Sequence, residues 1–106
     1  MIRNIDTDTA KKHYDNKVEF LDIREQHEFD QVHIPGSTLL PMSEMNSRWN
    51  EIPKDKEVVV YCRTGSRSLM LLGQLAQMGF SNLMNLEKGI VDWHQKQYPL
   101  EFGEED

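Results

Sequence analysis

Eight consecutive residues combine the types that cysteine chemistry requires: Tyr61-Cys62-Arg63-Thr64-Gly65-Ser66-Arg67-Ser68. The only cysteine of the chain, Cys62, follows the apolar run at residues 58–60 and precedes a helical pattern. A tight loop that leads into a helix leaves backbone N–H groups without intrahelical partners, at the positive end of the helix dipole. Such N–H groups bind anions, and their field favours the thiolate form of a cysteine. The segment therefore predicts a nucleophilic sulfur inside a cradle of backbone donors.

The residues that follow Cys62 favour a reactive sulfur over a buried, inert thiol. A lone cysteine usually acts as a small hydrophobic residue, but an inert thiol has no need of two arginines, a glycine and two hydroxyl groups directly after it. Gly65 accepts a positive φ that other residues resist, and both arginines add positive charge. We therefore predict that Cys62 is catalytic and that the substrate-binding loop consists of Arg63, Thr64, Gly65, Ser66 and Arg67.

Length, charge and composition restrict the classes of function. The 106 residues, 38% of them hydrophobic, are enough for one domain and too few for two. The formal net charge of -6 argues against nucleic acid or an anionic membrane as a partner, because both need clustered positive charge. One cysteine cannot form an internal disulfide and the four histidines show no ligand spacing, so we expect neither a metal nor another cofactor. The N-terminal residues lack the apolar core of a signal peptide and no apolar stretch is long enough to span a membrane, so we expect a cytoplasmic protein.

The elements that must position Cys62 alternate between strands and helices. We expect strands at residues 2–5, 18–23, 38–40, 57–61 and 82–86, and helices at residues 6–16, 24–31, 43–49, 67–78 and 87–97. The β-branched run at 57–61 is typical of the centre of a parallel sheet. Leu69 and Met70 belong to a wide apolar arc of helix 67–78, so we expect that helix to be deeply packed. We expect Phe29 and Val32 to turn inward from their helix.

This alternation predicts a small α/β domain with a mostly parallel central sheet of about five strands and helices on both faces. We expect the domain to span residues 1–100 and an acidic C-terminal tail to follow at residues 101–106. Ligands of such sheets bind beyond the carboxyl ends of the strands. Cys62 lies at that edge, and Asp22 and Arg24 reach it if their strand is a neighbour.

The chain resembles a single-domain rhodanese, a small sulfurtransferase domain. Three segments carry the resemblance and span most of the chain in the order typical of the family: Leu21-Asp22-Ile23-Arg24 with Glu28-Phe29, His33-Ile34-Pro35-Gly36-Ser37, and Cys62-Arg63-Thr64-Gly65-Ser66-Arg67-Ser68. The chain departs from the family pattern at Val32, where glycine is common. This departure affects a turn and not the chemistry.

The resemblance implies a persulfide mechanism. The Cys62 thiolate attacks the outer sulfur of thiosulfate or a similar donor, sulfite leaves, and the persulfide passes its sulfur to cyanide, another thiol or a protein. The resemblance also implies that Asp22 and Arg24 brace the junction between strand and helix. Arg67 either orients the anionic donor or pairs with a carboxylate and supports the loop.

Two other classes of function remain open. A cysteine phosphatase or arsenate reductase uses a related loop with one more residue between cysteine and arginine. Four residues lie between Cys62 and Arg67 here, which favours a cradle sized for a sulfur atom. The second alternative is a non-catalytic rhodanese-like domain that carries sulfur or binds a partner.

Overall fold

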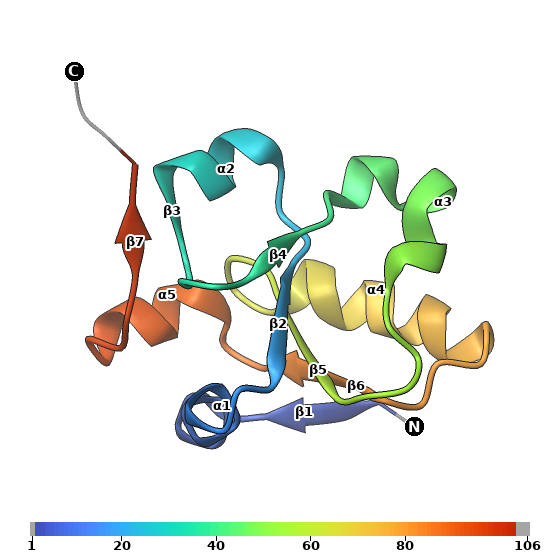
Figure 1. Cartoon of the computed structure of the whole chain (residues 1–106), viewed down its shortest axis with the longest axis horizontal. Helices are drawn as coiled ribbons and strands as arrows, with labels where there is room; N and C mark the ends of the chain where they lie inside the picture. Colours follow the sequence, from blue (N-terminus) through green and yellow to red (C-terminus); the bar gives the residue numbers. More distant parts are fainter. Residues whose placement is uncertain (1, 104–106) are drawn as a thin grey trace.

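A five-stranded parallel sheet forms the centre of the protein (Figure 1). The structure is a computed structural model, and it describes residues 2–103. The strand order is β1-β6-β5-β2-β4, and the strands are β1 (Arg3–Ile5), β2 (Glu19–Asp22), β4 (Thr38–Leu39), β5 (Val58–Tyr61) and β6 (Leu83–Leu86). The strand predicted for the centre of the sheet, β5, pairs in parallel with β2 and β6. The predicted α/β fold class is confirmed.

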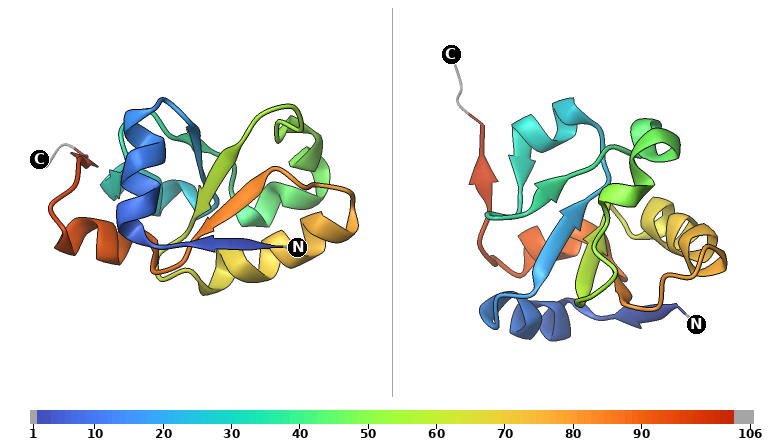
Figure 2. Two further views of the ribbon diagram at one scale, coloured as in Figure 1. Left: turned by 90° about the horizontal axis from the view of Figure 1, so that it is seen from below. Right: turned by 45° about the vertical axis from the view of Figure 1, so that its right-hand side comes forward.

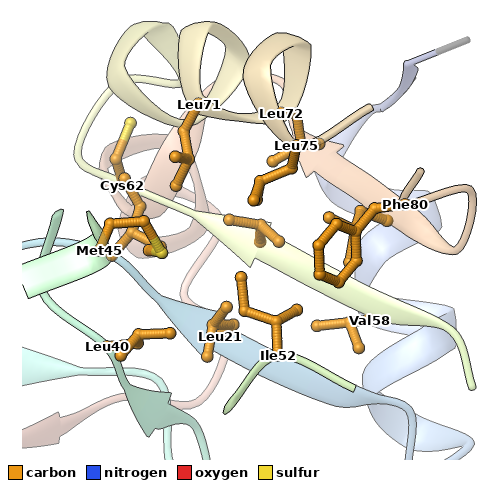
Figure 3. Close-up of a cluster of buried hydrophobic side chains, with 13 residues drawn as sticks. Leu21, Leu40, Met45, Ile52, Val58, Cys62, Leu71, Leu72, Leu75 and Phe80 are labelled. Atoms are coloured by element: carbon orange, nitrogen blue, oxygen red, sulfur yellow. The ribbon is translucent and has the colours of Figure 1, made fainter. Parts of the chain in front are cut away.

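Helices cover both faces of the sheet (Figure 2). They are α1 (Thr7–Asp15), α2 (Gln26–Gln31), α3 (Met45–Arg48), α4 (Ser66–Gln77) and α5 (Gly89–Gln95), with a short 3-10 turn on each side of α3. Val58 and Val60 of β5 pack in one buried cluster with α3 and α4 (Figure 3). Val59 and Tyr61 point to the opposite face, where they pack with α1 and α5. Successive strand residues alternate between faces, so β5 contributes to both halves of the core.

Two packing predictions are wrong. Helix α4 is buried on one face only, with Leu69 39% and Met70 65% exposed, because it covers the sheet from outside and no element within residues 2–103 covers its outer face. Helix α2 has no fully buried side chain. Phe29 is half-buried and stacks on the ring of His33 at a centroid distance of 3.8 Å, and Val32 lies in a strand rather than on the helix.

A second, two-stranded sheet joins the C-terminal end of the domain to α2. Strand β3 (Val32–His33) pairs antiparallel with β7 (Glu101–Phe102). The backbone N–H of Gly103 then donates to the carbonyl oxygen of Gln31 at 3.0 Å. The expected acidic tail at residues 101–106 therefore starts with a paired strand, and residues 104–106 lie outside the described residues. Over residues 2–103, every helix is too short or too polar to cross a membrane.

Candidate active site

Cys62 lies directly after the central strand β5, and its sulfur faces the first turn of α4. Cys62 is 1% exposed. Its Sγ accepts hydrogen bonds from the backbone N–H groups of Gly65 at 3.2 Å and Ser68 at 3.4 Å, and the Ser68 hydroxyl lies 3.2 Å away. The two N–H groups belong to the cap and first turn of α4, which have no intrahelical acceptors. Two backbone donors therefore surround the sulfur, one from the predicted loop, at Gly65, and one from Ser68, which follows that loop.

Gly65 gives this loop its shape. Its φ is +96°, in the left-handed region that favours glycine. A Cβ atom at this position would overlap the carbonyl oxygen of Glu87. The Gly65 carbonyl accepts a hydrogen bond from Nδ2 of Asn85 at 3.3 Å, and the Ser68 hydroxyl lies 3.3 Å from it and 3.2 Å from the sulfur, within donating distance of either. The positive φ and the lack of room for a side chain both require glycine at position 65, and the hydrogen bond to its carbonyl holds it in place. Its N–H group points to the sulfur.

Helix α5 holds the other side of the loop. The backbone N–H of Ile90 donates to the carbonyl oxygen of Cys62 at 3.0 Å, and that of Val91 donates to the carbonyl oxygen of Arg63 at 3.1 Å. Gly89 has a φ of +67°, and a side chain there would overlap the Arg63 backbone. The start of α5 thus binds the carbonyl groups of the loop, while the start of α4 provides N–H groups to the sulfur.

Arg67 forms a two-point ion pair with Glu28 of α2. Nη1 and Nη2 of Arg67 lie 3.1 and 3.0 Å from the two carboxylate oxygens. These hydrogen bonds lower the pKa of Glu28 to about 2 and raise the pKa of Arg67. Glu28 also accepts a hydrogen bond from the backbone N–H of Glu25 at the start of α2. Of the two roles left open for Arg67, this geometry matches the pairing that supports the loop.

Arg63 differs from Arg67 because its side chain is exposed. Among residues 2–103, none forms a hydrogen bond or ion pair with the Arg63 guanidinium. Arg63 is the loop arginine whose charge is available to an incoming anion. Thr64 and Ser66 are also exposed, and their hydroxyl oxygens lie 3.5 Å apart at the rim of the loop.

Asp22 and Arg24 form a buried ion pair after β2. They are 0% and 3% exposed, and Arg24 Nη2 lies 2.8 Å from Asp22 Oδ2. Burial lowers the pKa of Arg24, but hydrogen bonds and charge from Asp22 outweigh it and raise the pKa overall. The guanidinium also donates to the carbonyl oxygen of Val32 at 2.6 Å. The pair therefore links the end of β2 to β3, as expected for a brace, and neither residue bonds to the sulfur of Cys62.

A cavity of about 390 Å³ adjoins the loop between α2, α5 and the segment before β7. Its lining includes Arg24, Glu28, Arg63, Val91, His94 and Leu100. Arg63 belongs both to the loop and to this cavity, so a molecule in the cavity lies next to the cradle. The sequence does not predict this cavity, because its walls come from four separate segments.

Three further side chains contact the loop or its sulfur, and no role for them was predicted from the sequence. Ser68 was part of the motif, and its hydroxyl contacts the sulfur. Glu28 was part of the resemblance, and it holds Arg67. Asn85 is a buried amide within an otherwise apolar strand, which is the one signal that could have drawn attention to it. Among residues 2–103, no group of three or more histidine, cysteine or acidic residues is placed to hold a metal ion.

Comparison with known proteins identifies the family. The sequence profile of the rhodanese-like domain matches residues 6–96, most of the chain and all of the loop. The chain belongs to the rhodanese-like domain family. Its predicted membership is thereby confirmed.

Two relatives of this rhodanese-like domain are named for sulfur chemistry. A sulfurtransferase of Allochromatium vinosum is 36% identical over 102 residues, which is 94% of this chain and 95% of the relative. A putative sulfur carrier protein of Bacillus subtilis is 34% identical over 82 residues, which is 77% of this chain and 44% of the relative. The crystal structure of a rhodanese-related protein from Thermoplasma volcanium has a TM-score of 0.85 at 31% identity, covering 93% of this chain and 97% of that one. Sulfur transfer is the general activity that the family and these relatives support.

Proposed function

We propose that the protein takes a sulfane sulfur from thiosulfate or a related donor, holds it as a persulfide on Cys62, and passes it to a thiophilic acceptor. One observation carries the proposal: the Cys62 sulfur accepts hydrogen bonds from the backbone N–H groups of Gly65 and Ser68 at the start of α4. Donors in this arrangement stabilise negative charge on sulfur without having to reorganise. The same donors serve the thiolate and the persulfide anion.

The first step loads the sulfur. The Cys62 thiolate attacks the outer sulfur of thiosulfate, a new S–S bond forms, and the bond between that sulfur and the sulfonate breaks. The electron pair of the broken bond leaves with sulfite, so no oxidant or reductant is needed. The exposed guanidinium of Arg63 attracts and orients the dianionic donor. A separate general base is unnecessary where the surrounding donors already stabilise the thiolate.

The second step unloads it. A nucleophile such as cyanide, a thiol or a protein thiol attacks the outer sulfur of the persulfide. The S–S bond to Cys62 breaks, and its electron pair returns to Sγ as the thiolate. Donor and acceptor react in turn at one sulfur, which predicts ping-pong kinetics.

The remaining site residues support the loop. Arg67 ties the first turn of α4 to α2 through Glu28, and the Asp22–Arg24 pair fixes the end of β2. Thr64 and Ser66 form the exposed rim of the loop. A reducing compartment keeps a lone cysteine available for this cycle, so we place the activity in the cytoplasm.

The phosphatase alternative has less support than sulfur transfer. Four residues separate Cys62 from Arg67, and the Arg67 guanidinium is directed to Glu28 instead of toward the sulfur. A sulfur carrier is the second candidate, favoured by the likeness to the putative carrier of Bacillus subtilis. The two candidates share the Cys62 persulfide and differ in whether the acceptor is a small molecule or a protein.

The decisive experiment measures the intact mass of the protein after treatment with thiosulfate. Wild type should gain the mass of one sulfur atom and lose it again when cyanide is added. The Cys62→Ala variant, with its fold checked by circular dichroism, should never gain it. A wild type that stays unmodified with every sulfane donor would refute sulfur transfer. Turnover of an aryl phosphate would favour the phosphatase instead, and we expect none.

A further inference from the structure

Two asparagine side chains join the edge of the sheet to the loop around Cys62. Within residues 2–103, β1 is an edge strand that pairs only with β6, and Asn4 lies opposite Asn85 in the register of this pair (Figure 1). Nδ2 of Asn85 donates to Oδ1 of Asn4 at 2.9 Å and to the carbonyl oxygen of Gly65 at 3.3 Å. Asn85 is thus the middle of a chain of hydrogen bonds that starts at β1 and ends at the loop.

These two hydrogen bonds determine how the Asn85 amide is oriented. An amide side chain carries two N–H donors on its nitrogen and acceptor sites on its oxygen. Both donors of Asn85 are used, whereas its Oδ1 has no partner among residues 2–103. Half a turn of the amide would place Oδ1 against two other oxygen atoms. The shorter of the two bonds, the one to Asn4, therefore helps to keep Nδ2 directed at the loop.

The carbonyl group of Gly65 is held between α4 and β6. The backbone N–H of Leu69 donates to it at 3.1 Å from the helix, and Asn85 donates to it from the strand. Glycine has more backbone freedom than other residues, so the direction of its N–H depends on such fixed points. The Gly65 N–H lies 3.2 Å from the Cys62 sulfur. The orientation of the Asn85 amide therefore affects a donor that faces the reacting atom.

Asn4 is an unusual residue for its position. Asparagine is depleted in strands, and here two asparagines lie opposite each other in neighbouring strands. Asn4 is also exposed, and a substitution at an exposed position usually changes stability by little. A β-branched side chain would suit an edge strand better. The hydrogen bond to Asn85 is the property that distinguishes asparagine here.

We propose that Asn4 is a positioning residue for the sulfur-transfer reaction. Through Asn85 it fixes the Gly65 N–H, which stabilises negative charge on the Cys62 sulfur. This inference rests on the proposed function. The donors that bond to the sulfur are those of Gly65 and Ser68, so Asn4 acts on the rate of the reaction and not on the binding of the sulfur donor.

Three substitutions in β1 test this role. Asn4→Val removes the acceptor for Asn85 and adds a residue that favours strands, so the urea unfolding midpoint should stay close to that of wild type. The limiting rate of persulfide formation with thiosulfate should fall about threefold or more, and the half-saturating concentration of thiosulfate should stay the same. Asn4→Asp keeps an oxygen acceptor for Nδ2 and should load at the wild-type rate. Arg3→Val is the matched control, because the exposed Arg3 side chain pairs with Glu57, and it should also load at the wild-type rate.

A double variant shows whether Asn4 acts through Asn85. The combination of Asn4→Val with Asn85→Leu should form the persulfide no more slowly than Asn85→Leu alone, because the second change removes a bond that is already lost. Effects that multiply would show that Asn4 acts by another route and would overturn the proposal.

The amide proton of Gly65 provides a readout that does not depend on sulfur transfer. In NMR spectra of the reduced protein, its chemical shift should move in Asn4→Val, because its hydrogen bond to the sulfur changes. It should stay close to the wild-type value in Asn4→Asp and Arg3→Val. An unmoved Gly65 shift or an undiminished loading rate in Asn4→Val would overturn the positioning role. A wild type that never forms a persulfide would refute the proposed function, and the Gly65 shift would still decide whether Asn4 positions the loop.

Discussion

Asn85 of β6 donates a hydrogen bond from Nδ2 to the carbonyl oxygen of Gly65, 3.3 Å away. Gly65 in turn directs its N–H to the Cys62 sulfur at 3.2 Å. Asn85 is 1% exposed, and its Oδ1 has no hydrogen-bond partner among residues 2–103. Nδ2 also donates to Oδ1 of Asn4 in β1 at 2.9 Å, so Asn85 links the loop to β1.

Replacing Asn85 with leucine should therefore slow the reaction more than it harms the fold. Asn85→Leu removes the hydrogen bonds to Gly65 and Asn4, which destabilises the fold, and also removes the unpaired Oδ1, which stabilises it. Because these effects oppose each other, the free energy of unfolding should change by only about 1 kcal/mol. The rate of persulfide formation should fall about fivefold or more. Stopped-flow loading with thiosulfate and urea unfolding measure the two effects.

Asn82→Leu is the matched control, because among residues 2–103 the Oδ1 of Asn82 is also unpaired, and its Nδ2 donates to the carbonyl oxygens of Pro53 and Lys56, which precede β5, whereas the loop follows the other end of that strand. This control should lose stability and keep its loading rate. Equal loading rates in Asn85→Leu and wild type would contradict the positioning role.

Gly65→Ala should be much more destabilising than Gly79→Ala. Both glycines have nearly the same φ, +96° and +99°, so both variants carry a similar backbone strain of about 1–2 kcal/mol. Only at Gly65 does the added Cβ overlap another backbone atom, the Glu87 carbonyl oxygen; at Gly79 nothing lies within 4 Å. We expect Gly65→Ala to unfold at least about 2 kcal/mol more easily than Gly79→Ala. Similar unfolding midpoints would show that the loop adapts.

Ser68→Ala should weaken the stabilisation of the charged sulfur. The Ser68 hydroxyl is fully buried and lies 3.2 Å from Sγ. A hydrogen bond to a charged group contributes about 1.5–3 kcal/mol, which corresponds to a loss of roughly tenfold or more in rate. The measurement is the rate of persulfide formation with thiosulfate in Ser68→Ala and in the control Ser81→Ala, which replaces an exposed serine outside the loop. A rate in Ser68→Ala equal to that of Ser81→Ala would exclude the hydroxyl from the chemistry.

The Glu28–Arg67 pair should contribute to stability in a defined pH range. Arg67 lowers the pKa of Glu28 from its ordinary value of 4.5 to about 2. A lowered pKa means that the contribution is complete above pH 4.5 and is lost as the pH falls from 4.5 to about 2, where the folded state also takes up the proton. Wild type should therefore exceed Glu28→Gln in unfolding free energy at neutral pH, and the excess should shrink at a pH of about 3. An equal difference in unfolding free energy between wild type and Glu28→Gln at both pH values would contradict a lowered pKa for Glu28.

The features that could be predicted from the sequence are local ones. The cradle around Cys62 follows from consecutive residues, because a strand end, a glycine and a helix start within six positions determine where N–H groups point. The central position of β5 follows from its apolar, β-branched residues, which need cover on both faces.

The features that were missed depend on residues far apart in the chain. Glu28 meets Arg67 across 39 positions and Asn85 meets Gly65 across 20, and no spacing rule predicts such pairs. The apolar residues Leu69 and Met70 of α4 were expected to be buried, but a helix that covers a sheet buries one stripe whatever the width of its apolar arc. The pairing of Glu101–Phe102 with β3 was hidden in a short acidic segment, because two residues show no strand periodicity.

The anchoring of Gly103 to Gln31 has a practical consequence for anyone who extends this polypeptide. Gln31 lines the cavity beside the loop, so Gly103 lies at the rim of that cavity. The opposite end of the chain, at β1, lies away from it (Figure 1). An affinity tag or an enzyme fused at the C-terminal side would therefore start close to this cavity and could obstruct it. One fused ahead of β1 would leave the entrance of the cavity open.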